Sequence, residues 1–100
     1  MRLTYATAAV VQALAAGRRH GFDIIDAVGV RSGTVYPLLR RLEDAGLVRS
    51  RWEPVSEARE QRRPPRRYYE LTAAADELLQ RARAEFPADR HLPALETNRG

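Results

Sequence analysis

The segment Thr4–Ala16 places the strongest constraint on the fold, because it predicts a helix that is apolar almost all round. It contains no glycine or proline, and Gly17 follows it as a C-terminal stop. Such a helix must be buried on more than one side. A chain of 100 residues makes one domain with a small core. A second subunit is therefore the simplest cover, and the rest of the same chain is the alternative.

Two further helices are predicted after a polar break. Phe22–Val28 predicts a helix of about two turns, with Phe22 and Ile25 on one apolar face and Ile24 near it, closed by Gly29. The next helix, about 32–45, has one apolar stripe and ends at Gly46. That stripe, spaced i, i+3, i+4 and i+7, consists of Val35, Leu38, Leu39 and Leu42.

Pro37 leaves the start of this third helix open. If Ser32 is the N-cap, Pro37 lies just beyond the first turn, where its missing N–H costs a hydrogen bond. A start at Thr34 removes that cost. The sequence does not decide between a late start and a tolerated distortion.

A β-hairpin follows the helices. Leu47–Glu53 alternates between apolar and charged residues, with Val48 and Trp52 on one face, and predicts a half-exposed strand. Pro54–Pro65 predicts a polar loop, and Arg66–Leu71 predicts the return strand. The spacing therefore predicts two strands joined by a long loop.

A last helix, about 73–86, is predicted after Thr72 as its N-cap, and Pro87 stops it. We expect one domain over residues 1–86 and a loosely held tail over 87–100. The apolar stripe of the last helix consists of Ala75, Leu78, Leu79, Ala82 and Phe86.

Helix, helix, helix, strand, loop, strand, helix is a mainly α fold with a two-stranded β-hairpin wing. It predicts a winged helix-turn-helix plus one C-terminal dimerisation helix. All 17 basic residues are arginine. Residues 47–67 hold seven arginines and three glutamates, and so carry as much charge as the +4 of the whole chain. A localised basic patch favours a polyanionic partner.

The exposed face of the third helix is the predicted contact with duplex DNA. Small residues at its N-terminal end let the backbone approach closely, and its polar side chains can reach base edges or phosphates. The arginines near the end of the wing loop are too many to be paired with Glu57 and Glu60 alone, so we expect them to contact phosphates. The predicted DNA-binding residues are Ser32, Gly33, Thr34, Tyr36, Pro37, Arg40, Arg41, Arg62, Arg63, Arg66 and Arg67.

The chain also resembles the PadR-like family of bacterial transcriptional regulators, from about Ala9 to Leu79. The resemblance is carried by HGFDIID (20–26), SGTVYPLLRRLEDAGLVRSRWE (32–53) and RRYYELT (66–72). Two departures are a short turn before Ser32 and a longer wing loop, which inserts SEAREQRR before Pro64.

The resemblance implies a homodimer, held by the first and last helices, that binds a palindromic operator and usually represses. The apolar character of the first helix points to a dimer independently. The predicted dimer-interface residues are Leu3, Tyr5, Ala9, Val10, Leu78, Leu79, Ala82 and Phe86.

Other functions find less support in the sequence. A nucleophile–base set is absent, and a metal site of His20, Asp23 and Asp26 is less expected than a helix N-terminal turn with favourable acids. We therefore expect no enzyme, no metal and no cofactor. A winged-helix module that binds protein instead of DNA is the alternative, and RNA binding has no aromatic platform to support it.

The sequence leaves a small-molecule effector open. Trp52 with Tyr68 or Tyr69 can be an aromatic wall for a planar effector, although an apolar anchor of the hairpin is the more expected role. The absence of cysteine, of a signal-peptide pattern and of a membrane-spanning run predicts a cytoplasmic protein with no membrane partner.

Overall fold

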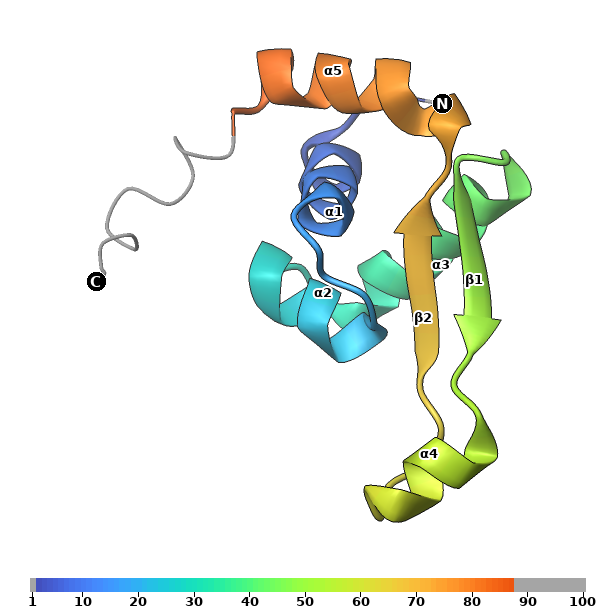
Figure 1. Cartoon of the computed structure of the whole chain (residues 1–100). Helices are drawn as coiled ribbons and strands as arrows, with labels where there is room; N and C mark the ends of the chain where they lie inside the picture. The colour runs from blue at the N-terminus through green and yellow to red at the C-terminus, as the bar shows by residue number, and fades with distance from the viewer. Residues whose placement is uncertain (1, 88–100) are drawn as a thin grey trace.

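Three helices, a β-hairpin and a final helix succeed one another in the computed structural model, which describes residues 2–87. The predicted winged helix-turn-helix fold is confirmed, and Figure 1 shows its arrangement. The two strands are antiparallel and pair Val48 with Leu71 at one end and Trp52 with Arg67 at the other. The helices and strands are α1 (Tyr5–Ala15), α2 (Gly21–Val28), α3 (Ser32–Asp44), β1 (Val48–Trp52), α4 (Val55–Glu60), β2 (Arg67–Leu71), the 3₁₀ turn η1 (Ala73–Ala75) and α5 (Asp76–Glu85).

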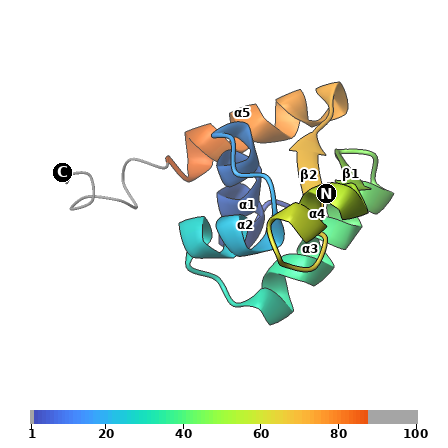
Figure 2. The same ribbon diagram turned by 60° about the horizontal axis from the view of Figure 1, so that its bottom comes forward.

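Helix α1 is covered on two sides by its own chain. Helices α2 and α3 pack on one side of it, and α5 lies across the other (Figures 1 and 2). The side chain of Gln12 fastens α5 by donating to the carbonyl of Phe86 at 2.8 Å. Val10 and Val11 are fully buried without a second chain. Their burial thus matches the alternative in which the same chain covers the helix.

Helix α3 begins with Ser32 as its first helical residue, so the prediction that Ser32 is the N-cap is wrong. Arg31 occupies that position with an extended backbone, and its carbonyl accepts from Thr34 N at 2.9 Å. The helix starts at Ser32 and contains Pro37, so the late start at Thr34 is wrong and the proline is tolerated inside the helix. The predicted stripe of Val35, Leu38, Leu39 and Leu42 is buried as expected.

The C-terminal end of α3 confirms the glycine stop. Gly46 has φ +79°, and Leu47 N donates to the carbonyl of Leu42 at 2.9 Å, the pattern of a Schellman cap. Thr72 was predicted to cap the last helix, but its hydroxyl does not do so. It donates to the Gly46 carbonyl at 2.7 Å, and the chain passes through η1 before α5 starts at Asp76.

Two aromatic residues that the sequence pattern placed on apolar faces lie on the surface. Phe22 is 79 % exposed and Trp52 is 61 % exposed. The prediction for Phe22 is wrong because α2 turns Ile24 into the core instead. The core lies between α1, α2, α3, β1 and α5, and its buried residues are Val10, Val11, Leu14, Ile24, Val35, Leu38, Leu39, Leu42, Val48 and Leu78.

The segment predicted to be a polar loop contains helix α4. Its carboxyl end is closed by Arg62, whose φ of +57° is left-handed, and by Arg63 N, which donates to the carbonyl of Ala58 at 3.2 Å. Ala58 is buried. The tip of the wing is therefore a folded unit, although its sequence has no apolar stripe.

Candidate nucleic-acid interface

The polar face of α3 is held outward by the core. Val35, Leu38 and Leu42 anchor the opposite side of the helix, so the intervening positions face solvent. All seven α3 residues predicted to contact DNA are exposed: Ser32, Gly33, Thr34, Tyr36, Pro37, Arg40 and Arg41.

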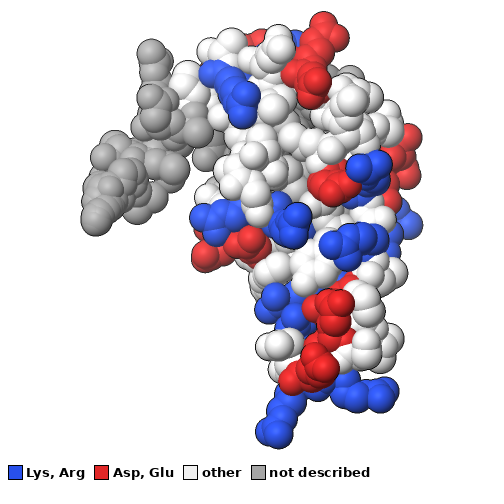
Figure 3. All heavy atoms as spheres, viewed as in Figure 1, with Lys and Arg blue, Asp and Glu red and all other residues white. Residues whose placement is uncertain are grey.

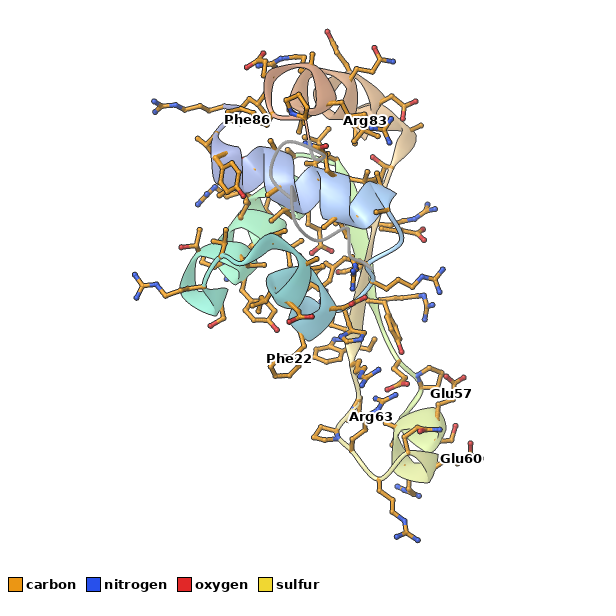
Figure 4. The ribbon with its side chains drawn as sticks, turned by 90° about the vertical axis from the view of Figure 1, so that its left-hand side faces the viewer. Phe22, Glu57, Glu60, Arg63, Arg83 and Phe86 are labelled. Carbon is orange, nitrogen blue, oxygen red and sulfur yellow. The ribbon has the colours of Figure 1, made fainter. Side chains whose placement is uncertain are left out.

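Tyr36 also has a packing role that the sequence did not reveal. Its ring lies directly on Gly21, the first residue of α2, and is 42 % exposed. A Cβ atom at Gly21 would lie 2.6 Å from Tyr36 Cζ, closer than real Cβ contacts. Phe22, the next residue, projects from this end of α2 (Figure 4). Tyr36 thus fixes α3 against α2 and leaves two aromatic side chains exposed near the predicted interface.

The strands of the wing carry stacked pairs of arginine and aromatic residues. The Arg67 guanidinium carbon lies 5.0 Å from the centre of the Trp52 ring, and the Arg51 guanidinium carbon lies 4.9 Å from that of Tyr68. Arg67 also lies 3.8 Å from a carboxylate oxygen of Glu43 on α3. Trp52 is thus a surface platform for Arg67, and the prediction that it is an apolar anchor is wrong.

The base of the wing is fastened by a buried carboxylate, Glu53, which is 4 % exposed. Arg63 donates to it from both terminal nitrogens, at 2.5 and 2.8 Å. The backbone N–H of Arg66 donates at 3.2 Å and the hydroxyl of Tyr68 at 3.3 Å. The bidentate Arg63 pair, joined by these other donors, lowers the pKa of Glu53 to about 2.

This carboxylate changes the interpretation of the wing arginines. The premise that they lack carboxylate partners is wrong for Arg63, which pairs with Glu53, and for Arg67, which approaches Glu43. Figure 4 shows Arg63 between the strands and α4. Sequence proximity pointed to Glu57 and Glu60 as partners of the wing arginines, whereas the partner of Arg63 is Glu53, ten residues away. Arg62 and Arg59 remain exposed at the tip, where positively charged side chains extend outward in Figure 3.

The predicted dimer-interface residues divide into two groups. Val10, Leu78 and Ala82 are buried within the single chain, in the contact between α1 and α5. The others keep some exposure, and the ring of Tyr5 meets that of Phe86 edge to face at 6.1 Å between centroids. The partly exposed group consists of Leu3, Tyr5, Ala9, Leu79 and Phe86.

Within residues 2–87, histidine and carboxylate side chains form no group of three or more that could hold a metal ion. His20, Asp23 and Asp26, weighed as ligands in the sequence, are accordingly not such a group. Asp23 is held instead by Arg18 at 2.8 Å, and this bond lowers its pKa. In the same part of the chain, no helix is both long and apolar enough to cross a membrane.

Comparisons with known proteins agree with this geometry. Similar folds include a PadR family transcription regulator from Clostridium difficile R20291, with TM-score 0.70, 22% identity and coverage of 88% of this chain and 93% of that one. A PadR-like transcription factor from Bacteroides fragilis has TM-score 0.65 and 27% identity, with 85% and 82% covered. Bordetella bronchiseptica BpsR, whose DNA binding is regulated by 6-hydroxynicotinic acid, has TM-score 0.62 and 22% identity, with 89% and 72% covered.

No curated protein matches the chain. A sequence profile, however, matches residues 10–81, which contain α2, α3 and the whole wing. The profile is that of the transcriptional regulator PadR-like family. The chain belongs to the PadR-like family of transcriptional regulators.

Proposed function

We propose that the protein is a sequence-specific repressor that acts in the cytoplasm as a homodimer on a palindromic operator. The observation that carries the proposal is the exposed polar face of α3, beside a wing that presents Arg59 and Arg62 at its tip. The α3 face suits a major groove, where polar side chains distinguish base pairs. The wing tip suits phosphates or a narrow minor groove.

Arg40 provides the direct test of the recognition face. It is exposed on α3, opposite the buried stripe, so Arg40→Ala leaves the core intact. If Arg40 reads a base edge, the variant loses about 1–3 kcal/mol of binding free energy and relaxes preference at one base pair. Fluorescence anisotropy with a duplex selected from a random pool measures both effects.

Arg83→Ala is the matched control, because it removes the same charge from the exposed surface of α5 (Figure 4). Equal affinities for Arg40→Ala, Arg83→Ala and wild type would contradict the proposal that the exposed face of α3 recognises base pairs. If the wild type binds no duplex even at low salt, the protein-interaction alternative replaces the whole proposal.

The dimer is proposed to form through α1 and α5, using the partly exposed group defined above. We expect sedimentation equilibrium to give twice the 11.3 kDa of the chain at micromolar concentration. Leu79 is half-buried on α5, and Leu79→Arg should shift the equilibrium toward monomer because it buries an unpaired charge. Gln80→Arg, which adds the same charge at the exposed neighbouring position, should stay dimeric. A wild-type monomer would refute the dimer.

Regulation by a small molecule is part of the proposal. It is supported by BpsR, a similar fold whose DNA binding is regulated by 6-hydroxynicotinic acid.

A further inference from the structure

A hollow of about 510 Å³ separates the α1–α2 turn from the base of the wing. One wall belongs to the helical body and includes Arg19 and His20, and the other belongs to the wing. The hollow is lined by Gly17, Arg19, His20, Asp23, Arg51, Pro54, Glu57, Arg66 and Tyr68.

The two walls are joined by main-chain contacts and are preorganised. Tyr69 N donates to the carbonyl of Arg19 at 2.7 Å, and the backbone of His20 pairs with that of Tyr68 in a single antiparallel β-bridge. The rings of these last two residues meet edge to face with centroids 6.2 Å apart. The hollow is therefore a fixed feature of the interface between body and wing.

Guanidinium groups outnumber the free carboxylates around the hollow. Arg19, Arg51 and Arg66 line it, and over residues 2–87 none of the three forms a salt bridge. The guanidinium group of Arg51 stacks on the ring of Tyr68. Of the two lining carboxylates, Asp23 is already neutralised by Arg18. Figure 3, which looks onto this side, shows basic side chains gathered between the helical body and the wing.

We propose that this hollow binds a phosphate group, held by Arg19, Arg51 and Arg66. Arginine presents a planar set of donors that matches phosphate oxygens, and three of these side chains supply more positive charge than the remaining carboxylate, Glu57, removes. The phosphate comes either from a free small molecule or from the backbone of bound DNA. Only the DNA source rests on the proposed function.

An occupied hollow would add a further link between the helical body and the wing. Pro54 and Glu57 reach it from the segment that carries α4, whereas Arg19 reaches it from the helical body. A phosphate bound by Arg19 and Arg66 thus connects the body to the wing. Ligand binding would therefore reinforce the existing contact between the helical body and the base of the wing.

His20 reports on occupancy of the hollow. Burial and the nearby charge of Arg66 lower its pKa, so an added anion should raise it. The test follows the His20 imidazole by NMR across pH, in inorganic phosphate and in sodium chloride of equal ionic strength. We expect the His20 pKa of the wild type to be higher in phosphate than in chloride. In the double variant Arg19→Gln/Arg66→Gln, the His20 pKa should be the same in the two salts.

A second arm identifies a backbone phosphate. Duplex affinity is measured against salt for the wild type, for the same double variant and for Arg81→Gln/Arg83→Gln, which removes equal charge from exposed positions on α5. If DNA supplies the phosphate, the hollow variant binds about tenfold more weakly. Its slope of log affinity against log salt also falls by about 0.9 for each phosphate that the variant no longer neutralises, and the α5 variant keeps both values.

A raised His20 pKa in phosphate supports the site. Weaker duplex binding by the hollow variant then assigns the phosphate to DNA, and unchanged duplex binding assigns it to a free small molecule. The proposal is overturned if phosphate leaves the His20 pKa unchanged and the hollow variant binds duplex like the α5 variant. A wild type that binds no duplex refutes the proposed function alone, because the phosphate titration still decides the hollow. Circular dichroism of both double variants establishes that they are folded.

Discussion

Glu53→Gln is expected to release the wing tip while the helical body stays folded. The carboxylate accepts two hydrogen bonds from Arg63, one from Arg66 N and one from Tyr68. Glutamine has nearly the same shape, but it offers one acceptor oxygen and turns an NH₂ group toward donors. Arg63 would then lose its counter-charge in a partly buried place.

The expected result is faster amide hydrogen exchange over α4 (Val55–Glu60) with unchanged exchange in α3. Duplex affinity should fall at the same time, because Arg59 and Arg62 are carried by this unit. The salt slope should drop by about 0.9 for each phosphate that the released wing no longer neutralises. Glu60→Gln is the control, since it removes an exposed glutamate from the same helix. Equal exchange in the two variants would mean that Glu53 does not hold the wing.

The same carboxylate predicts the pH range over which the wing is held. Its pKa is lowered from 4.5 to about 2 in the folded wing, so the folded wing favours the ionised form. The stabilisation of the folded wing by the ionised Glu53 carboxylate is fully present above pH 4.5. It shrinks below that pH and is lost as the pH falls through about 2. The pH dependence of the Glu53 carboxyl ¹³C shift measures this directly, and a midpoint near 4.5 would contradict the prediction.

Regular elements were predictable where burial repeats at a helical or strand period. Val35, Leu38, Leu39 and Leu42 specify both the existence of α3 and which face points outward. The exposed residues of the recognition face follow from that stripe by geometry. Helix α4 escaped prediction because it is short and buries only Ala58, so no period marks it.

Side-chain partners were much less predictable than elements. Arg63 has Glu60 three residues away, yet it pairs with Glu53, because the left-handed turn at Arg62 carries it back across the hairpin. Phe22 was placed on the apolar face of its helix by its spacing from Ile25. The orientation of α2 is set by Ile24 in the core and by the Tyr36 ring over Gly21, and neither contact is local in sequence.

Gly21→Ala should disturb both the fold and the recognition face. The new methyl group would lie 2.6 and 2.7 Å from Tyr36 Cζ and Cε1, so the ring must swing away or α2 must move from α3. Overpacking of this kind costs about 1–3 kcal/mol, against up to ~1 kcal/mol gained from replacing glycine in a helix. Because Tyr36 is on the predicted DNA-contacting face, duplex affinity should fall as well.

A double-mutant cycle isolates this contact. In a Tyr36→Ala background the obstructing ring is gone, so Gly21→Ala should become neutral or stabilising in urea unfolding. The coupling between the two positions should be about 0.5–3 kcal/mol. Gly33→Ala is the matched control for stability, because a Cβ there meets nothing within 4 Å, and it should be stabilising in both backgrounds. If Gly21→Ala costs the same with and without the Tyr36 ring, the two helices are held together by their core residues alone.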